Sequence, residues 1–317
     1  MYTILIAGAG QLGSRHLQGV KSSLHELDIW VYDLSLESLR IAEERYYQVD
    51  SKVPKTVHFV SELIHVPKSI DIVIVSSGSK PRASIIKNIL ASKSVQYMIL
   101  EKFLFTRLNE YDEIDALIKV NGVKSWVNCP RRMFKAYEYI KSKIDVSSTV
   151  EMSYIGGEWG MCCNTIHFVD IFMFLVGESN YELNIDGLRN EVFDSKRAGY
   201  VEVIGTELFI TPRLNKLKLI SALDFVGTPC VTIKCGNNHI EYYEGTGQLY
   251  INGICEDFQV PYQSELSGVL VDELIQTKNC RLTTYEESAL YHKNFLREIG
   301  PFINKIKGWS SDSCPIT

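Results

Sequence analysis

The sequence lacks both the excess of basic residues typical of nucleic-acid binding and the long apolar run of a membrane span. Its 317 residues carry 33 Lys and Arg against 38 Asp and Glu, a net charge of −5, with no basic cluster. Such a balance offers no electrostatic attraction for nucleic acid. The longest apolar candidate, residues 166–176, is interrupted by His167 and Asp170 and is shorter than a membrane span. We therefore expect neither a nucleic-acid nor a membrane partner.

The sequence also lacks the signals of export and of a cysteine-based metal site. An apolar segment starts at residue 3, which leaves no room for a signal peptide. None of the eight cysteines forms a C-x-x-C pair. Cys162 and Cys163 are adjacent, and neighbouring residues on a regular element point in different directions. We therefore expect reduced thiols in a cytoplasmic protein, and no metal site.

Short apolar segments alternate with helical segments over the first 128 residues. The expected strands are residues 3–7, 29–32, 57–59, 70–76, 97–100 and 125–127, and the expected helices are residues 12–27, 36–47, 82–92 and 108–121. This alternation predicts an α/β domain, residues 1–128, with a doubly wound parallel sheet covered by helices on both faces.

The pattern changes after residue 128. Expected strands follow one another at residues 200–211, 217–223, 230–235, 239–243 and 248–251, and expected helices lie at residues 131–144, 163–176, 263–277 and 285–303. Consecutive strands predict an open, mostly antiparallel sheet in a second, α+β domain, residues 129–317. We expect Pro301 to kink or shorten the last helix and the tail from Gly308 to be frayed.

The first apolar segment leads directly into G-x-G-x-x-G, formed by Gly8, Gly10 and Gly13. These glycines allow a tight turn, a close approach of the backbone to a pyrophosphate, and close packing of the helix on the sheet. Asp33 follows the second expected strand and could accept hydrogen bonds from adenosine ribose hydroxyls, whereas it would repel a 2′-phosphate. The combination predicts NAD rather than NADP. A glycine-rich turn in another kind of α/β protein is the alternative. The candidate cofactor-binding residues here are Gly8, Gly10, Gln11, Leu12, Gly13 and Asp33.

Four features occur in an order that resembles the Gfo/Idh/MocA family, named after glucose–fructose oxidoreductase and inositol dehydrogenase. They are the glycine motif, the strand that ends at Ser76 and Ser77, the pair Glu101-Lys102, and His167-x-x-Asp170. The resemblance implies a Rossmann domain and a second domain whose open sheet makes a homodimer or higher oligomer. It also implies an NAD(P)-dependent oxidoreductase of sugars, cyclitols or nucleotide sugars. Lys102 and His167 then correspond to acid–base groups, and Ser76, Ser77, Glu101 and Lys102 to cofactor contacts.

Two positions depart from the family pattern. Phe103 stands where the family has proline after the lysine, often with a cis peptide. A cis bond before a residue other than proline costs about 2.5–4 kcal/mol, so we expect a different local backbone. Cys163 stands where the family often has aspartate, four residues before the histidine, and cannot hold a carboxylate charge. The chain is more similar to a branch associated with the biosynthesis of bacterial surface sugars.

Six residues are candidates for binding the substrate, namely Lys102, Asn128, Arg131, Trp159, Asn164 and His167. Lys102 follows an apolar strand, where ligands bind in open α/β sheets, although it could also be a surface residue paired with Glu101. His167 could equally be a satisfied core histidine. Asn128 could contact the nicotinamide ribose or the substrate. Arg131 could bind a substrate anion or form a salt bridge near a helix N-terminus.

Together these patterns predict an NAD(H)-dependent oxidoreductase that acts on a hydroxyl or ketone of a sugar, a sugar acid or a nucleotide sugar. Two alternatives keep the same fold. One is a dinucleotide-binding regulator or scaffold without turnover, which the loss of the carboxylate at Cys163 would favour. The other is an epimerase or lyase that uses NAD transiently, with no net oxidation or reduction.

Overall fold

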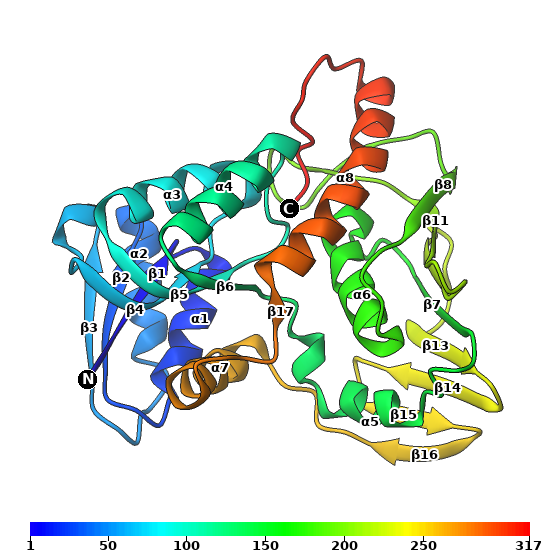
Figure 1. The fold of residues 1–317 in the computed structure, drawn as a ribbon, viewed down its shortest axis with the longest axis horizontal. Coiled ribbons are helices and arrows are strands. Elements are labelled where there is room, and N and C mark those ends of the chain that lie inside the picture. Colours follow the sequence, from blue (N-terminus) through cyan, green and yellow to red (C-terminus); the bar gives the residue numbers. More distant parts are fainter. The chain divides into compact units, whose positions relative to one another are not determined.

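The computed structural model describes the backbone of residues 1–317 and every side chain except those of residues 263 and 264. The chain forms two compact units (Figure 1). Unit 1 contains Met1–Phe105, Asn109–Pro130 and Pro261–Glu286, and unit 2 contains Thr106–Leu108, Arg131–Val260 and Glu287–Thr317. The sequence-based division at residue 128 lies near one crossing but did not anticipate that residues 261–286 return to unit 1.

Unit 1 is built on a seven-stranded sheet with the strand order β17-β6-β5-β4-β1-β2-β3. Its strands are β1 (Tyr2–Ala7), β2 (Leu27–Tyr32), β3 (Lys55–Val60), β4 (Ser69–Val75), β5 (Ser94–Leu100), β6 (Lys124–Val127) and β17 (Thr283–Thr284). The first six strands are parallel, and β17 joins the β6 edge antiparallel. This topology confirms the predicted doubly wound α/β fold, with strands apolar enough to be buried on both faces.

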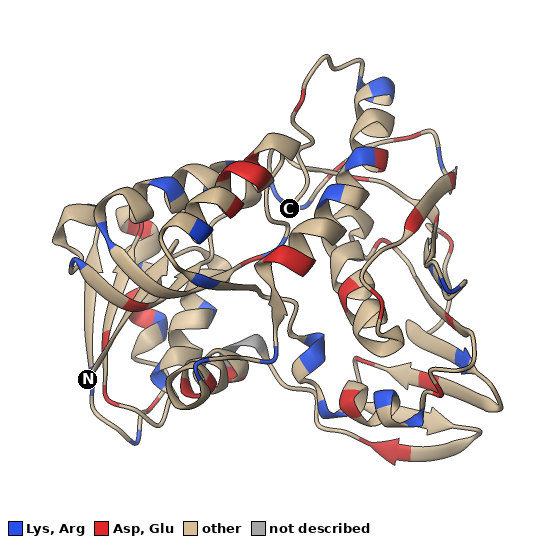
Figure 2. Cartoon of the chain, in the orientation of Figure 1, with Lys and Arg blue, Asp and Glu red and all other residues tan. Residues whose placement is uncertain are grey.

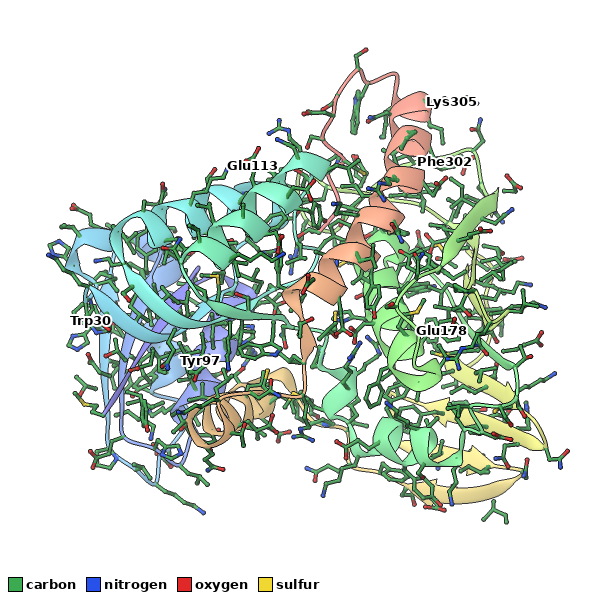
Figure 3. All side chains as sticks on the ribbon, viewed as in Figure 1. Trp30, Tyr97, Glu113, Glu178, Phe302 and Lys305 are labelled. Atoms are coloured by element: carbon green, nitrogen blue, oxygen red, sulfur yellow. The ribbon has the colours of Figure 1, made fainter. Side chains whose placement is uncertain are left out.

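Five helices cover this sheet, and their bounds are α1 (Gln11–Lys21), α2 (Leu36–Tyr46), α3 (Ser79–Ser92), α4 (Leu108–Val120) and α7 (Gln263–Thr277). Helices α3 and α4 lie side by side, joined by the ion pair between Lys87 and Glu113 at 2.5 Å (Figure 3). Helix α1 packs against both α2 and α7. It ends at Lys21 and not at residue 27 as predicted, because Ser22 and Ser23 bond back to the last turn and begin a tight connection to β2.

Unit 2 contains an eight-stranded sheet with the order β16-β15-β14-β13-β7-β12-β11-β8. Its strands are β7 (Val150–Gly156), β8 (Glu182–Leu188), β11 (Gly205–Ile210), β12 (Lys216–Ser221), β13 (Cys230–Cys235), β14 (Asn238–Tyr243), β15 (Gln248–Ile251) and β16 (Ile254–Asp257). Only β7 and β12 pair in parallel, so the predicted mostly antiparallel sheet is confirmed. The expected strand at 200–211 is divided, because β10 (Val201–Glu202) pairs instead with β9 (Phe193–Asp194).

The helices of unit 2 correct two expectations. The expected helix at 131–144 is divided into a short 3₁₀ turn (Pro130–Met133) and α5 (Lys135–Lys143), because Phe134 is extended. Helix α8 (Tyr285–Lys307) runs through Pro301 and is not shortened there. Its apolar side chains Phe295, Ile299 and Ile303 are fully buried, and this packing offsets the lost backbone hydrogen bond. Helix α6 (Met161–Val176) packs against β10 and β12 and is buried along most of its length.

The last residues of the chain are packed within unit 2 and are not frayed as predicted. The backbone N–H of Cys314 donates to the carbonyl of Thr106 at 2.8 Å, and that of Val201 donates to the carbonyl of Pro315 at 2.9 Å. Ile316 is fully buried. Burial of apolar surface, together with these backbone hydrogen bonds, offsets the entropy that is lost when the tail is fixed.

Basic and acidic residues are interspersed along the helices and strands of each unit (Figure 2). All eight cysteines are free thiols. Among the described residues, no helix combines the length and the apolar character that a membrane span needs.

Unit 2 buries one carboxyl group without a cationic partner. Glu207 on β11 is fully buried; one of its oxygens accepts a hydrogen bond from Thr165 on α6 at 2.7 Å, and the other has no partner among the described residues. Burial raises the pKa of Glu207 to about 8, and the charge of Glu202 adds to the rise against the opposing hydrogen bond from Thr165. At neutral pH the folded protein therefore keeps the proton on this carboxyl.

This proton makes the stability of unit 2 depend on pH. The folded state retains it while the unfolded state releases it, so stability falls as pH rises from about 4.3 toward 8. Glu207→Gln removes the dependence, and we expect it to raise the free energy of unfolding by about 3.5 kcal/mol more at pH 8 than at pH 5. Thermal unfolding at both pH values measures this. The exposed Glu151→Gln on β7 is the control. An equal effect of Glu207→Gln at both pH values would contradict the assignment.

Candidate functional site

The loop from β1 to α1 is held tightly by its own backbone. Gly8 has φ +105°, a conformation that side chains other than glycine rarely adopt. A Cβ at Gly13 would lie 1.8 Å from the carbonyl oxygen of Gly8. The hydroxyl of Ser76, which follows β4, donates to that same carbonyl at 2.7 Å. Gly8 and Gly13 are therefore required by the fold of the loop itself.

Gly10 differs from these two glycines. Its φ is −64°, and a Cβ there would have no atom within 4 Å, so neither conformation nor packing requires a glycine. No side chain caps α1 at Gly10, which leaves the first N–H groups of the helix, including those of Gln11 and Leu12, directed to this open space. A bare helix N-terminus beside a glycine without steric need fits a pyrophosphate group of a dinucleotide.

Asp33, which follows β2, connects this loop to the start of α2. One carboxylate oxygen accepts the backbone N–H of Ala9 at 2.6 Å, and the other accepts that of Ser35 at 2.8 Å. A carboxylate has about four acceptor positions, so both oxygens can still accept a ribose hydroxyl. The predicted cofactor residues Gly8, Gly10, Gln11, Leu12, Gly13 and Asp33 are thus brought together at one end of the sheet.

The remaining cofactor candidates lie at the carboxyl ends of the neighbouring strands. Ser76 and Ser77 follow β4, Glu101 and Lys102 follow β5, and Asn128 follows β6. Since β4, β5 and β6 are adjacent, these residues form a row along the edge where open α/β sheets bind ligands. Lys102 is 9% exposed, and the hydroxyl oxygen of Ser77 is buried without a partner among the described residues.

Glu101 is the centre of a buried hydrogen-bond network. Its Oε1 lies 2.8 Å from His16 Nε2 on α1 and accepts Asn128 Nδ2 at 2.5 Å. His16 Nδ1 in turn lies 2.8 Å from the hydroxyl of Ser267 on α7. Burial raises the pKa of Glu101, but hydrogen bonds from His16 and Asn128 and the charge of Lys102 outweigh this effect and leave it below its usual value. Glu101 is therefore a carboxylate, and the His16 side chain holds it in place.

The backbone after Lys102 corrects one expectation. The Lys102–Phe103 peptide bond is cis, although Phe103 replaces the proline of the family pattern. Phe103 is fully buried, and the guanidinium of Arg82 donates to the carbonyls of Phe103 and Leu104. These contacts hold the segment with a cis peptide bond, whereas the sequence predicted a different local backbone because Phe103 is not a proline.

In unit 2, two candidate substrate residues line a pocket of about 410 Å³ at the N-terminus of α6. Trp159 donates from Nε1 to the carbonyl of Ile220 at 2.9 Å, and Asn164 donates to the carbonyls of Trp159 and Gly160. Cys163 also lines the pocket. Other lining residues come from α6, β12, the β9–β10 segment and the chain end, among them Glu158, Arg197, Glu202, Ser221 and Thr317.

The two adjacent arginines bind carboxylates of unit 2. Arg131 forms a bidentate pair with Glu244 at 2.6 and 2.8 Å, and the hydroxyl of Tyr137 donates to the same carboxylate. Arg132 pairs with the fully buried Asp170 at 2.9 Å. These contacts fit the salt-bridge alternative for Arg131. To bind a substrate anion as well, Arg131 would have to share the N–H donors that bond Glu244.

His167 lies on α6 and is partly exposed.

Among the described residues, no group of three or more His, Cys, Asp and Glu is arranged to hold a metal ion. Cys162 is buried, and burial raises the pKa of its thiol well above the usual value, so it is an inert thiol at neutral pH.

The sequence analysis named candidate site residues but missed distant residues that hydrogen-bond to side chains in this region. Ser267 and Glu244 are far along the chain from His16 and Arg131, and no local motif contains them. The only signal for Ser267 is its place on an amphipathic helix, which does not say what that helix packs against.

Two alanine substitutions separate the roles of the glycines. In Gly13→Ala the new Cβ collides with Gly8, and we expect a loss of about 1–3 kcal/mol in the free energy of unfolding. In Gly10→Ala we expect unchanged thermal unfolding but dinucleotide affinity lowered at least about tenfold, because the methyl group fills the space for the pyrophosphate. Calorimetric titration with NADH measures the second effect. Full NADH affinity in Gly10→Ala would contradict the placement.

Asp33 should select the cofactor. We expect NADPH to bind at least about tenfold more weakly than NADH, because the carboxylate repels a 2′-phosphate. Asp33→Ser should lower NADH affinity and reduce the preference, and cofactor fluorescence measures both. Tighter binding of NADPH by the unaltered protein would show that Asp33 does not have this role.

Residues 2–129 match the model of a family described as an oxidoreductase family with an NAD-binding Rossmann fold, Gfo/Idh/MocA. No curated protein sequence matches the chain significantly.

Several solved structures share the fold over nearly the whole chain. An oxidoreductase from Agrobacterium radiobacter, in complex with NAD+, L-tartaric acid and magnesium, is 12% identical with a TM-score of 0.73, covering 97% of this chain and 99% of its own. UDP-N-acetylglucosamine 3-dehydrogenase from Acidithiobacillus ferrooxidans is 12% identical with a TM-score of 0.69, covering 93% and 95%. Biliverdin reductase from Synechocystis, with biliverdin and NADP+, is 14% identical with a TM-score of 0.66, covering 93% and 98%.

At these identities the solved structures show a shared fold alone, whereas the family model covers the glycine loop, Asp33 and the Glu101–Asn128 network. Residues 2–129 of this chain therefore match the NAD-binding Rossmann domain of the Gfo/Idh/MocA oxidoreductase family.

Proposed function

We propose that the chain is an NAD(H)-dependent dehydrogenase or reductase that acts on a hydroxyl or ketone of a sugar, a sugar acid or a nucleotide sugar. The observation that carries this proposal is the position of Lys102. It follows β5 at the edge where open α/β sheets bind ligands, and its neighbour Glu101 is held by the buried side chains of His16 and Asn128.

In this proposal, the bound dinucleotide supplies the site that accepts or releases the hydride. The residues of unit 1 bind and orient it: the helix N-terminus at Gly10 binds the pyrophosphate, and Asp33 binds the adenosine ribose. The ammonium of Lys102 donates a hydrogen bond to the reacting oxygen and exchanges a proton with it. His167, on α6 of unit 2, is the second acid–base candidate.

We assign the sugar to the pocket at the N-terminus of α6. Trp159 presents an aromatic surface held by its bond to Ile220, and rings of this kind suit the apolar face of a sugar. Acidic, basic and hydroxyl groups line the rest, including Glu158, Arg197 and Ser221, and they can bind sugar hydroxyls. The names of two solved relatives, one holding L-tartaric acid and one a nucleotide-sugar dehydrogenase, favour polyhydroxylated substrates.

Our proposal also covers the quaternary structure and the location of the protein. We propose a cytoplasmic homodimer or higher oligomer formed through the outer face of the eight-stranded sheet, and a role in the biosynthesis of surface-polysaccharide sugars. That face carries Glu151, Lys216, Lys218 and Lys234, whose opposite charges could pair between copies.

A second candidate function is favoured by Cys163, which replaces a carboxylate in the pocket. Without that charge, the chain could bind NAD as a regulator or use it transiently in an epimerase or lyase reaction. Net formation or consumption of NADH with sugar acids and nucleotide sugars distinguishes the dehydrogenase from both. Without net turnover, exchange of deuterium into the sugar identifies the transient use.

Lys102→Ala tests the mechanism. We expect kcat to fall about 10²–10⁴-fold, since a positioned proton donor contributes that much, while NADH affinity stays within about twofold. Steady-state kinetics with a substrate found in the screen above, together with fluorescence titration of NADH, measure both. Lys124→Ala, an exposed lysine at the opposite end of the same sheet, is the matched control. Unchanged kcat in Lys102→Ala would remove this lysine from the mechanism.

A further inference from the structure

Asn128 is a buried amide with one end bonded and the other without a partner. It is 2% exposed, and its Nδ2 donates to Glu101. Its Oδ1 is buried and accepts no hydrogen bond from any described residue. A buried acceptor left without a donor costs about 1–3 kcal/mol. The bond to Glu101 explains the NH₂ end of Asn128, but stability does not explain the buried carbonyl oxygen at its other end.

The network fixes which end of the amide is which. Glu101 is a carboxylate and can only accept hydrogen bonds, so the NH₂ group of Asn128 must be the end that faces it. Glu101 is held from its other side by His16, and His16 by Ser267. The amide cannot turn over without placing its oxygen against the carboxylate. The carbonyl oxygen of Asn128 therefore faces away from Glu101, and this atom can only accept a hydrogen bond.

The position of Asn128 indicates what that acceptor meets. It follows β6, next to the β5 end that carries Lys102, and its backbone N–H donates to Leu100 at 2.8 Å. In a doubly wound sheet the glycine loop after β1 binds the pyrophosphate, and the two nucleotide halves extend across the two halves of the sheet. Asp33 after β2 marks the adenosine half, so the β4–β6 half receives the nicotinamide.

We propose that Asn128 Oδ1 accepts a hydrogen bond from the carboxamide N–H of the nicotinamide. A primary amide is a neutral donor, which suits an acceptor that sits beside a carboxylate and would repel an anion. The bond makes Asn128 a ligand-binding residue that fixes the rotation of the ring relative to Lys102. The proposal rests on dinucleotide binding and not on turnover.

Ser77 is another buried polar group at this edge without a partner among the described residues, and it cannot have the same role. Its hydroxyl rotates and can either donate or accept, so it does not discriminate between ligand groups. The Oδ1 atom of Asn128 can only accept, and it therefore selects a ligand group that donates.

An analogue that lacks the donor tests the assignment. In 3-acetylpyridine adenine dinucleotide a methyl group replaces the amide nitrogen of the nicotinamide. We expect the unaltered protein to bind this analogue roughly tenfold more weakly than NAD+ in calorimetric titrations, because Asn128 Oδ1 would stay unpaired. In Asn128→Ala we expect the ratio of the two dissociation constants to fall close to one, with NAD+ weakened and the analogue little changed.

Ser125→Ala is the matched control, since Ser125 lies on β6 itself and also has a buried oxygen without a partner, but not at the carboxyl end. It should keep the ratio of the unaltered protein. A ratio near one in the unaltered protein, or an unchanged ratio in Asn128→Ala, overturns the proposal. The first measurement needs no variant, so a failure of Asn128→Ala to fold does not prevent the test. Absence of turnover with an intact ratio would contradict only the proposed function.

Discussion

The buried carboxylate of Glu101 is the group on which the arrangement of unit 1 depends. An ionised group in the interior is stable only when charges and hydrogen bonds surround it. Its partners come from separate parts of the chain: His16 from α1, Asn128 from the end of β6 and, through His16, Ser267 from α7. Helix and strand ends that could otherwise shift are thereby fixed around one oxygen atom, and the position of Lys102 follows from that of its neighbour.

The two units use charge differently. In unit 1, the candidate groups for binding a cofactor are backbone N–H groups, a carboxylate at Asp33 and a lysine, so the proposed binding depends on local geometry. In unit 2, the two adjacent arginines already have carboxylate partners, Arg131 with Glu244 and Arg132 with Asp170. The pocket beside α6 is therefore left to an indole, hydroxyls and exposed charges, a surface that distinguishes shape and hydrogen bonding more than net charge.

The parts of the fold that obey local rules could be predicted from the sequence. The glycine loop, Asp33 and the alternation of strands and helices depend on residues within a short segment, and they lie where expected. The sequence did not predict β7 or β8, the packed chain end or the unbroken helix at Pro301, because these depend on distant partners. The same limit applies to the site. Lys102 could be placed by its strand, whereas the sequence could not connect Ser267 with His16 or Glu244 with Arg131.

The return of residues 261–286 to unit 1 has a consequence for synthesis on the ribosome. Domains generally fold as units, the N-terminal one first, while the chain emerges. Here α7 supplies Ser267, the outer partner of His16, and it emerges only after residues 131–260 of unit 2. The nascent Rossmann domain must therefore wait with one side of α1 uncovered until most of the other unit has been made. During this interval the surface of α1 that α7 covers in the folded chain stays exposed to water.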